Sequence, residues 1–332
     1  MKMKKFINTP ENLVSELLSG FAMANADKVV VEDGLVCRKS SKSADKVAVV
    51  TLGGCGHEPA LSGFVGKGML DISVPGEIFA APGPPKLLAA LRKAKRDAGT
   101  LLITLNHAGD VMSANMAKQM AEKESIKVSE VLTCEDISTG PREKPEERRG
   151  LAGCLLVCKI AGAAAEAGEN LEEVTRIAQK VADNMATLAV AATSATHPST
   201  GQVIAEVPEE DVIIGMGQHG EAGSGQMPLP TAKETVAFML PALLEDLSIA
   251  KGEKVMVMIN GVGSTTLMEQ YIVLNDCKNM LTEKGIEMAR SAAGEFLTVQ
   301  EMGGFQMIVC RMDDELLKYY DMPASSPAFT IE

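Results

Sequence analysis

Three short segments of the chain combine glycine with residues that can attack a carbonyl carbon or move a proton. The first contains His57, the second Asp110 and the third His219. Near neutral pH an imidazole can act as a nucleophile or a base, and a carboxylate can act as a base. Neighbouring glycines let the backbone approach a ligand closely. The segments are Gly53-Gly54-Cys55-Gly56-His57-Glu58-Pro59, Asn106-His107-Ala108-Gly109-Asp110 and Gly215-Met216-Gly217-Gln218-His219-Gly220-Glu221.

Each of these segments directly follows an apolar stretch that predicts a β-strand, at residues 47–52, 101–105 and 212–216. In open α/β sheets, ligands bind beyond the carboxyl ends of the strands. A single glycine-rich turn could equally be a plain connection whose histidine caps a helix. Three such turns on matching strand ends favour a binding or catalytic site.

The wider pattern predicts an α/β protein with two lobes, because strand-like and helix-like stretches alternate almost throughout. At 332 residues the chain exceeds one typical hydrophobic core. We expect largely parallel or mixed sheets in an N-terminal α/β lobe (1–192) and a C-terminal α/β lobe (193–332) that carries His219. Residues 193–201, rich in small turn-forming residues, mark the boundary. The expected helices are 10–18, 85–97, 112–123, 151–167, 171–185, 232–246 and 266–284, and the expected strands are 29–31, 47–52, 101–105, 128–133, 212–216, 254–259 and 306–311.

Composition narrows the classes of partner and the cellular location. A net charge of −12 argues against a nucleic-acid-binding surface, and no apolar run is long enough to cross a membrane. The lysines at the N-terminus are not followed by the apolar segment of a signal peptide. Seven cysteines, an odd number without framework spacing, indicate reduced thiols. We therefore expect a cytoplasmic protein.

The sequence lacks the motifs of a nucleotide site. It has no G-x-x-x-x-G-K-S/T, and residues 63–68 (GFVGKG) do not match that pattern. The segment that contains His57 is not a G-x-G-x-x-G either. We therefore expect that this chain alone binds neither ATP nor another cofactor. A metal is also not expected, because no short ligand spacing joins Cys55, His57, Asp110 and His219.

Residues 53–70 (GGCGHEPALSGFVGKGML) and 215–223 (GMGQHGEAG) resemble the signatures of the dihydroxyacetone kinase substrate-binding (K) subunit family. The resemblance runs from end to end of the chain. The resemblance indicates a divergent paralogue within that family. Further matching stretches are residues 108–112, 148–168, 260–264, 293–299 and 303–305.

The resemblance implies a role for each matching residue. His219 matches the histidine whose imidazole adds to a ketone carbon and forms a covalent hemiaminal, which selects carbonyl sugars over polyols. Asp110 matches the carboxylate that takes the proton from the hydroxyl that accepts phosphate. His57 matches a substrate-binding histidine that assists acid–base chemistry. Gly53 and Gly54 match positions where the backbone contacts the sugar.

The resemblance also implies partners. The family forms homodimers and receives its phosphoryl group from a second subunit that carries ADP or ATP with Mg²⁺. In some bacteria a phosphotransferase-system protein rephosphorylates that nucleotide. The implied function is phosphorylation of dihydroxyacetone (glycerone), or of a related short ketose, in glycerol metabolism. Two alternatives are a dihydroxyacetone-binding sensor that activates a transcription regulator and a storage protein for carbonyl metabolites; retention of Asp110 favours the kinase subunit.

Several positions depart from the family pattern. Where the family usually reads K-N-Y-T-G-D, this chain has LNHAGD at residues 105–110, so that a sugar-binding lysine is Leu105 and a tyrosine is His107. Leu105 cannot donate a hydrogen bond to a sugar hydroxyl. We therefore predict weaker binding of dihydroxyacetone than in a typical member, or a different preferred ketose. The remaining departures are Leu52, Cys55, His197 and Phe329.

Overall fold

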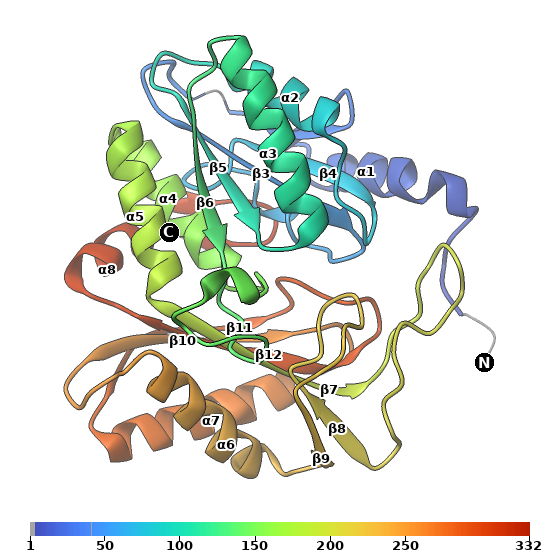
Figure 1. The fold of residues 1–332 in the computed structure, drawn as a ribbon, viewed down its shortest axis with the longest axis vertical. Helices are drawn as coiled ribbons and strands as arrows, with labels where there is room; N and C mark the ends of the chain where they lie inside the picture. The colour runs from blue at the N-terminus through green and yellow to red at the C-terminus, as the bar shows by residue number, and fades with distance from the viewer. Residues whose placement is uncertain (1–3, 41) are drawn as a thin grey trace. The chain divides into compact units, whose positions relative to one another are not determined.

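The computed structural model describes residues 4–40 and 42–332, which form two compact units, each with its own six-stranded sheet (Figure 1). The Asp110 unit comprises Lys4–Thr133, Cys154–Ala182 and Leu316–Glu332. The described part of the His219 unit comprises Cys134–Gly153 and Asp183–Glu315. Both units are therefore discontinuous in the chain, whereas the sequence pattern predicts one boundary, between residues 192 and 193. The difference arises because two helices after residue 153 return to the first sheet.

The sheet of the Asp110 unit is mixed, with its strands in the order β1-β2-β4-β3-β5-β6. Its central strands β4, β3, β5 and β6 run parallel, while β1 and β2 form an antiparallel hairpin at one edge. Parallel strands need crossover helices, and here these cover the sheet. The strands are β1 Val29–Glu32, β2 Leu35–Arg38, β3 Ala48–Cys55, β4 Ile72–Ile78, β5 Thr100–Leu105 and β6 Val128–Thr133.

Helices α2 and α3 pack against one face of this sheet, where leucines of α2 and alanines of α3 meet the core residues of β3. Helix α4 is buried along nearly its whole length, as its almost uninterrupted apolar sequence predicts. Its one buried lysine, Lys159, donates a hydrogen bond to the carbonyl of Tyr319 at 2.8 Å. The helices are α1 Leu13–Ala24, α2 Pro84–Lys93, α3 Ala108–Lys123, α4 Cys154–Ala167, α5 Leu171–Asp183 and α8 Asp314–Tyr320.

The sheet of the His219 unit is also mixed but mainly antiparallel, with the order β11-β10-β12-β7-β8-β9. Within it, β10 and β11 pair in parallel and the other neighbours are antiparallel. Helices α6 Ala232–Asp246 and α7 Leu267–Lys284 cover one face, and each begins with a capping box. The strands are β7 Met185–Thr193, β8 Asp211–Ile214, β9 Gly225–Pro228, β10 Lys254–Gly261, β11 Glu287–Gly294 and β12 Gly303–Arg311.

The strands that the sequence pattern does not predict include β2, β4, β9 and β11, and also β7 in the interior of the sheet of the His219 unit. The sequence of β7, MATLAVAAT, is rich in alanine, which is depleted in strands. The segment is nevertheless a strand because it lies between β12 and β8 and pairs with both. Among the described helices, none combines the length and the apolar character that a membrane span requires.

Candidate functional site

The loops that carry His57 and Asp110 follow neighbouring strands. Strand β3 ends at Cys55 and β5 ends at Leu105, and the two strands pair in parallel. Both loops therefore leave the sheet at the same edge, the carboxyl edge where α/β proteins bind ligands. This placement was predicted from the sequence for both loops.

Glycines in the His57 loop are required by the segment that follows β4. A Cβ atom on Gly54 would lie 2.7 Å from the backbone nitrogen of Ala80. Gly56 has a φ of +102°, and a Cβ there would lie 2.8 Å from the ring of Phe79. The same ring packs on buried His57, with 4.9 Å between the ring centroids. Backbone and ring packing thus fix the position of His57.

The other polar groups of this loop bring little reactivity. Burial raises the pKa of the Cys55 thiol to about 12. At neutral pH this thiol is therefore protonated, and only a thiolate would be a good nucleophile or metal ligand. Both carboxylate oxygens of Glu58 accept a hydrogen bond from the backbone nitrogen of Gly56, at 3.0 and 3.1 Å, and burial raises the pKa of Glu58. These groups shape the loop.

Asp110 lies in the first turn of α3 with 8% of its surface exposed. The positive end of the helix dipole favours a negative charge at this position. The hydroxyl of Ser113 anchors the helix by donating a hydrogen bond to the carbonyl of Pro82 at 2.6 Å. Leu105, at the end of β5, is 4% exposed, and His107 occupies the N-cap position of α3. Asp110 is thus a largely buried carboxyl group at the N-terminal turn of α3.

His219 lies in a hairpin loop between β8 and β9, because Ile214 pairs with Gly225 in an antiparallel register. The loop therefore follows its strand, as expected, but leads into the antiparallel strand β9 and not into a helix. The loop is closed by the backbone bonds from Ser224 to Ile214 at 2.8 Å and from Gly217 to Glu221 at 3.0 Å. It owes its shape to several glycines rather than to a parallel strand end.

Glu221 holds His219 through both of its oxygens. Oε2 accepts the backbone N–H of His219 at 2.9 Å, and Oε1 lies 3.1 Å from Nδ1 of the ring. Burial raises the pKa of Glu221, but the hydrogen bond and charge of His219 outweigh this effect and hold the pKa well below its usual range. Because an ionised carboxylate only accepts hydrogen bonds, Nδ1 is the nitrogen that donates to Oε1, and Nε2 is the nitrogen that carries the lone pair whenever the ring is neutral.

Glu221 was not among the predicted site residues, although an acid two positions after a histidine in a glycine-rich loop is a usable signal. The predicted residues Gly53, Gly54, His57 and Asp110 all belong to the Asp110 unit, on two neighbouring loops. His219 belongs to the His219 unit.

His197 lies in a turn of the His219 unit, as expected for a residue in the segment 193–201. Its ring nitrogen Nδ1 accepts a hydrogen bond from the backbone nitrogen of Ser199 at 3.2 Å. Its carbonyl accepts one from the backbone nitrogen of Gly201 at 2.8 Å. These contacts give this departure from the family pattern a local structural role.

The two mixed six-stranded sheets, with histidines and a carboxylate on glycine-rich loops, define a two-unit α/β protein. The chain belongs to the Dak1 domain family, which matches residues 19–328. This match confirms the family resemblance that residues 53–70 and 215–223 indicated.

Two curated relatives cover nearly the whole chain. It is 38% identical to the PTS-dependent dihydroxyacetone kinase, dihydroxyacetone-binding subunit DhaK of Lactococcus lactis subsp. lactis, over 95% of each chain. It is 36% identical to D-erythrulose kinase of Mycolicibacterium smegmatis, over 98% of this chain and 56% of that protein. The first relative has about the length of this chain, and the second is much longer.

Two solved structures share the fold. The dihydroxyacetone kinase operon co-activator Dha-DhaQ superposes with a TM-score of 0.89 at 28% identity, over 95% of this chain and 98% of that chain. The dihydroxyacetone kinase from C. freundii, in complex with AMP-PNP and Mg²⁺, gives a TM-score of 0.88 at 29% identity, over 99% of this chain and 61% of that chain. These superpositions confirm the predicted mixed α/β fold.

Proposed function

We propose that this chain is the substrate-binding subunit of a kinase that phosphorylates a short ketose. His219 holds the ketone covalently, and Asp110 takes the proton from the hydroxyl that receives the phosphoryl group. His57, Gly53 and Gly54 bind the sugar. The observation that carries the proposal is the contact between Glu221 and His219, because it leaves the ring with a nucleophilic Nε2.

The covalent step is an addition that needs no external reagent. The lone pair of Nε2 forms a bond to the carbonyl carbon while the π electrons of the C=O bond move to the oxygen. The oxygen takes up one proton from water to become the hydroxyl of the hemiaminal, and Nδ1 releases its proton to water by way of Glu221, so that one proton moves from nitrogen to oxygen overall. A polyol such as glycerol has no carbonyl carbon and cannot form this adduct. His219 therefore gives the site its preference for ketoses.

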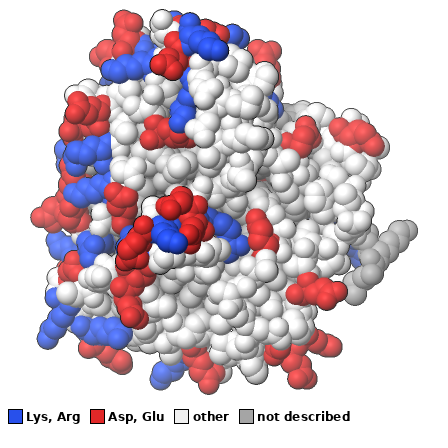
Figure 2. All heavy atoms as spheres, in the orientation of Figure 1, with Lys and Arg blue, Asp and Glu red and all other residues white. Residues whose placement is uncertain are grey.

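The phosphoryl donor is the second part of the proposal. The nucleotide, ADP or ATP with Mg²⁺, is carried by a separate kinase subunit. A row of exposed methionines on α3 starts two residues after Asp110, with Met112 62% exposed, followed by Met116 and Met120. Figure 2 shows that the face over α3 is largely uncharged. Flexible methionine side chains adapt to a protein partner, so this row supports docking of that subunit.

The chain also functions as a homodimer under this proposal. Large apolar side chains lie exposed in the His219 unit, on the first turns of α7 and just after β9, and a second copy of the chain would cover them. These side chains are Leu229, Leu267, Met268, Tyr271 and Ile272. Light scattering tests the dimer, which should have twice the mass of the chain. We further expect the protein to work in the cytoplasm, in glycerol metabolism, without a nucleic-acid or membrane partner.

The substrate class is a ketose of three or four carbons, since one relative is a dihydroxyacetone-binding subunit and another is a D-erythrulose kinase. Loss of the family lysine at Leu105 removes a charge-assisted donor. A hydroxyl directed at Leu105 would lose its hydrogen bond with water without gaining another. A ketose that places no hydroxyl there avoids this cost.

A dihydroxyacetone sensor is the second candidate, favoured by the match to the co-activator Dha-DhaQ. Such a protein needs the histidine adduct but no base. Asp110, held at the N-terminus of α3, therefore favours the kinase subunit.

The discriminating experiment mixes this chain with a nucleotide-carrying kinase subunit, ATP and Mg²⁺. Dihydroxyacetone, erythrulose and glycerol are then offered separately. We expect phosphorylation of a ketose and none of glycerol. Asp110→Asn should lower turnover by roughly 10²- to 10⁴-fold while the adduct still forms, because a base acts mainly in the transition state. If the chain binds the ketose but none of the kinase subunits tested phosphorylates it, the sensor is favoured.

A further inference from the structure

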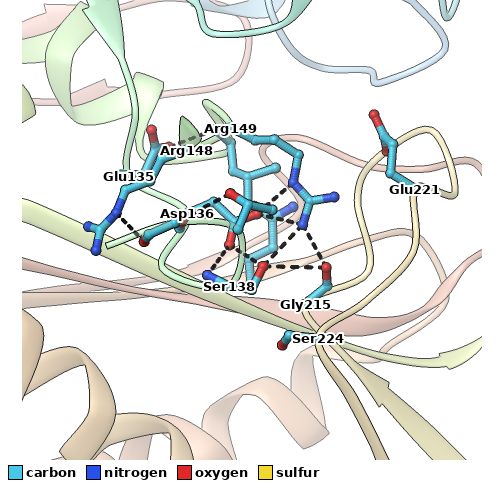
Figure 3. Close-up of polar contacts among 12 residues, drawn as sticks. Glu135, Asp136, Ser138, Arg148, Arg149, Gly215, Glu221 and Ser224 are labelled. Atoms are coloured by element: carbon cyan, nitrogen blue, oxygen red, sulfur yellow. Dashed lines mark hydrogen bonds and ion pairs between the residues drawn. The ribbon is translucent and has the colours of Figure 1, made fainter. Parts of the chain in front are cut away.

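A buried ion pair lies beside the loop that carries His219, within the same unit (Figure 3). Nε of Arg149 donates to Oδ2 of Asp136 at 2.8 Å, and the Asp136 side chain is fully buried. The other carboxylate oxygen, Oδ1, accepts the backbone N–H and the hydroxyl of Ser138 at 2.9 and 2.6 Å. Asp136 thus fixes both Arg149 and Ser138.

Arg149 reaches from this pair to the start of the hairpin loop. Its Nη2 donates to the carbonyl oxygen of Gly215 at 2.6 Å and to the hydroxyl of Ser138 at 3.1 Å, as Figure 3 shows. Gly215 has a φ of +73°, and a Cβ there would lie 2.4 Å from Cβ of Ser138. The chain therefore leaves β8 pressed against Ser138 with its carbonyl held by Arg149.

Arg149 and Glu221 also meet at one glycine of the loop. A Cβ atom on Gly217 would lie 2.3 Å from Nη1 of Arg149 and 2.1 Å from Oε2 of Glu221. The guanidinium and the carboxylate that holds His219 therefore lie against the same side of Gly217. A path of contacts thus leads from Asp136 through Arg149 and Gly217 to Glu221 and the ring of His219.

We propose that Asp136, Ser138 and Arg149 are positioning residues that fix the direction of the His219 imidazole for addition to the ketone. This inference deepens the proposed function and rests on it. Carbonyl addition needs the nitrogen within a narrow range of position and angle, and a displacement of about 1 Å can cost roughly 10²-fold in rate. Buried ion pairs contribute little net stability, so positioning explains this one better than stabilisation does.

An arginine is required by this arrangement and a lysine cannot replace it. The planar guanidinium donates to Asp136, Ser138 and Gly215 at once, in fixed directions. A lysine keeps the charge but offers a single ammonium that cannot span the three acceptors. Arg149→Lys therefore removes the geometry while preserving the charge.

The chain supplies a matched control in the adjacent residue. Arg148 is also buried in an ion pair, with Nη2 2.5 Å from Oδ1 of Asp246, a residue at the end of α6. Its Nε donates to the carbonyl of Gly140 at 2.8 Å. Arg148→Lys thus disturbs a comparable ion pair of the same segment, through bonds to Asp246 and Gly140, which both lie outside the hairpin loop.

The experiment measures the rate of adduct formation with ¹³C-labelled dihydroxyacetone by NMR, in wild type, Arg149→Lys and Arg148→Lys. Each rate is divided by the concentration of folded protein, and thermal melting gives the folded fraction of each variant. We expect Arg149→Lys to slow adduct formation by roughly 10- to 100-fold. Arg148→Lys should stay within about twofold of wild type. ¹⁵N-histidine spectra, simple because the chain has four histidines, should show that only Arg149→Lys lowers the Nδ1–H population of His219.

The outcomes separate the two proposals. Suppose that wild type forms the adduct and that Arg149→Lys forms it at the same rate with unchanged ¹⁵N signals. This result would overturn the positioning role and leave the proposed function standing. No adduct in wild type would overturn the proposed function and the positioning role with it. Should Arg149→Lys fail to fold, Ser138→Ala replaces it. The expected decrease is roughly fivefold, because Arg149 loses the hydroxyl that accepts from it and Asp136 loses the hydroxyl that donates to it. An unchanged rate there would also overturn the positioning role.

Discussion

The loops of His57 and Asp110 are held differently from the loop of His219. In the Asp110 unit, neighbouring parallel strands end at the same edge and the backbone around residues 79–83 packs against the loops. In the His219 unit, a hairpin loop is held by charged side chains, Arg149 at the start of the loop and Glu221 within it. The first arrangement depends on close backbone packing and the second on electrostatics and hydrogen bonds.

This difference has a consequence for how each region responds to change. Close-packed backbone has no room for an added atom, so a substitution that adds one there lowers the free energy of unfolding. At Gly217 the nearest atoms belong to the side chains of Glu221 and Arg149, which can move aside, so a substitution there leaves the fold intact but shifts the reactive group. A substitution at Gly54 should therefore lower stability, whereas one at Gly217 should lower reactivity.

A pair of glycine substitutions tests this contrast and has the largest expected effect on stability. Gly54→Ala places a Cβ 2.7 Å from the backbone nitrogen of Ala80, which cannot move independently, and should lower the free energy of unfolding by about 3 kcal/mol. Gly217→Ala meets only the ends of the Arg149 and Glu221 side chains and should cost about 1 kcal/mol. Urea denaturation measures both values.

The same pair should behave in the opposite way when adduct formation is measured. Gly217→Ala displaces Glu221 from His219, so we expect it to form the ketose adduct at least roughly tenfold more slowly. If Gly217→Ala loses as much stability as Gly54→Ala while keeping its adduct rate, the contrast between the two regions is wrong.

The pH dependence of stability tests the electrostatic character of the His219 unit. Glu135, adjacent to Asp136, is fully buried and accepts the backbone N–H of Leu151 at 2.8 Å. Burial raises the pKa of Glu135 from 4.5 to about 7. Between pH 4.5 and about pH 7, Glu135 is ionised in the unfolded chain but keeps its proton in the folded protein. Stability should therefore fall as pH rises from 4.5 to 7, by up to about 1.4 kcal/mol per pH unit.

Glu135→Gln should remove this decline, because a neutral amide keeps an acceptor for Leu151 and does not ionise. Melting temperatures between pH 4.5 and pH 7.5 provide the measurement, with the exposed Glu143→Gln as the control. A decline that is equally steep in wild type and Glu135→Gln would show that Glu135 is not its source.

The smallest expected effect concerns ligand choice in the Asp110 unit. Leu105→Lys restores the lysine of the family pattern and should tighten binding of dihydroxyacetone by roughly tenfold, because a charge-assisted hydrogen bond contributes about 1–3 kcal/mol. Calorimetry with dihydroxyacetone, erythrulose and hydroxyacetone measures this, and Leu105→Met controls for repacking of the buried site. If wild type binds dihydroxyacetone more tightly than the other two ligands, and Leu105→Lys binds it no more tightly than wild type does, the proposed change in ligand preference is wrong.

The contrast between the regions also explains what the sequence could predict. Each predicted helix and strand overlaps an observed element. The positions of His57 and Asp110 follow from local patterns of apolar strand and glycine turn. The alanine-rich strand β7 was missed because its pairing with β12 and β8 overrides its local preference.

The support of His219 could not be predicted in the same way. Arg149 is 66 residues before Gly215 in the sequence, and residues 135–149 look like an ordinary charged loop. The contact forms because Ile137 and Thr187 join this segment to β7, beside β8. Local sequence patterns do not contain such a pairing.

The most direct test of the account is the mass of the protein after incubation with a short ketose. Wild type should gain the full mass of one ketose per chain, since addition expels no water. Peptide mapping after trapping should place the gain on His219. His219→Ala, whose melting temperature should equal that of wild type, should gain no mass from the ketose. Neither protein should gain mass from glycerol. An adduct that persists in His219→Ala would contradict the assignment of His219 as the residue that holds the sugar.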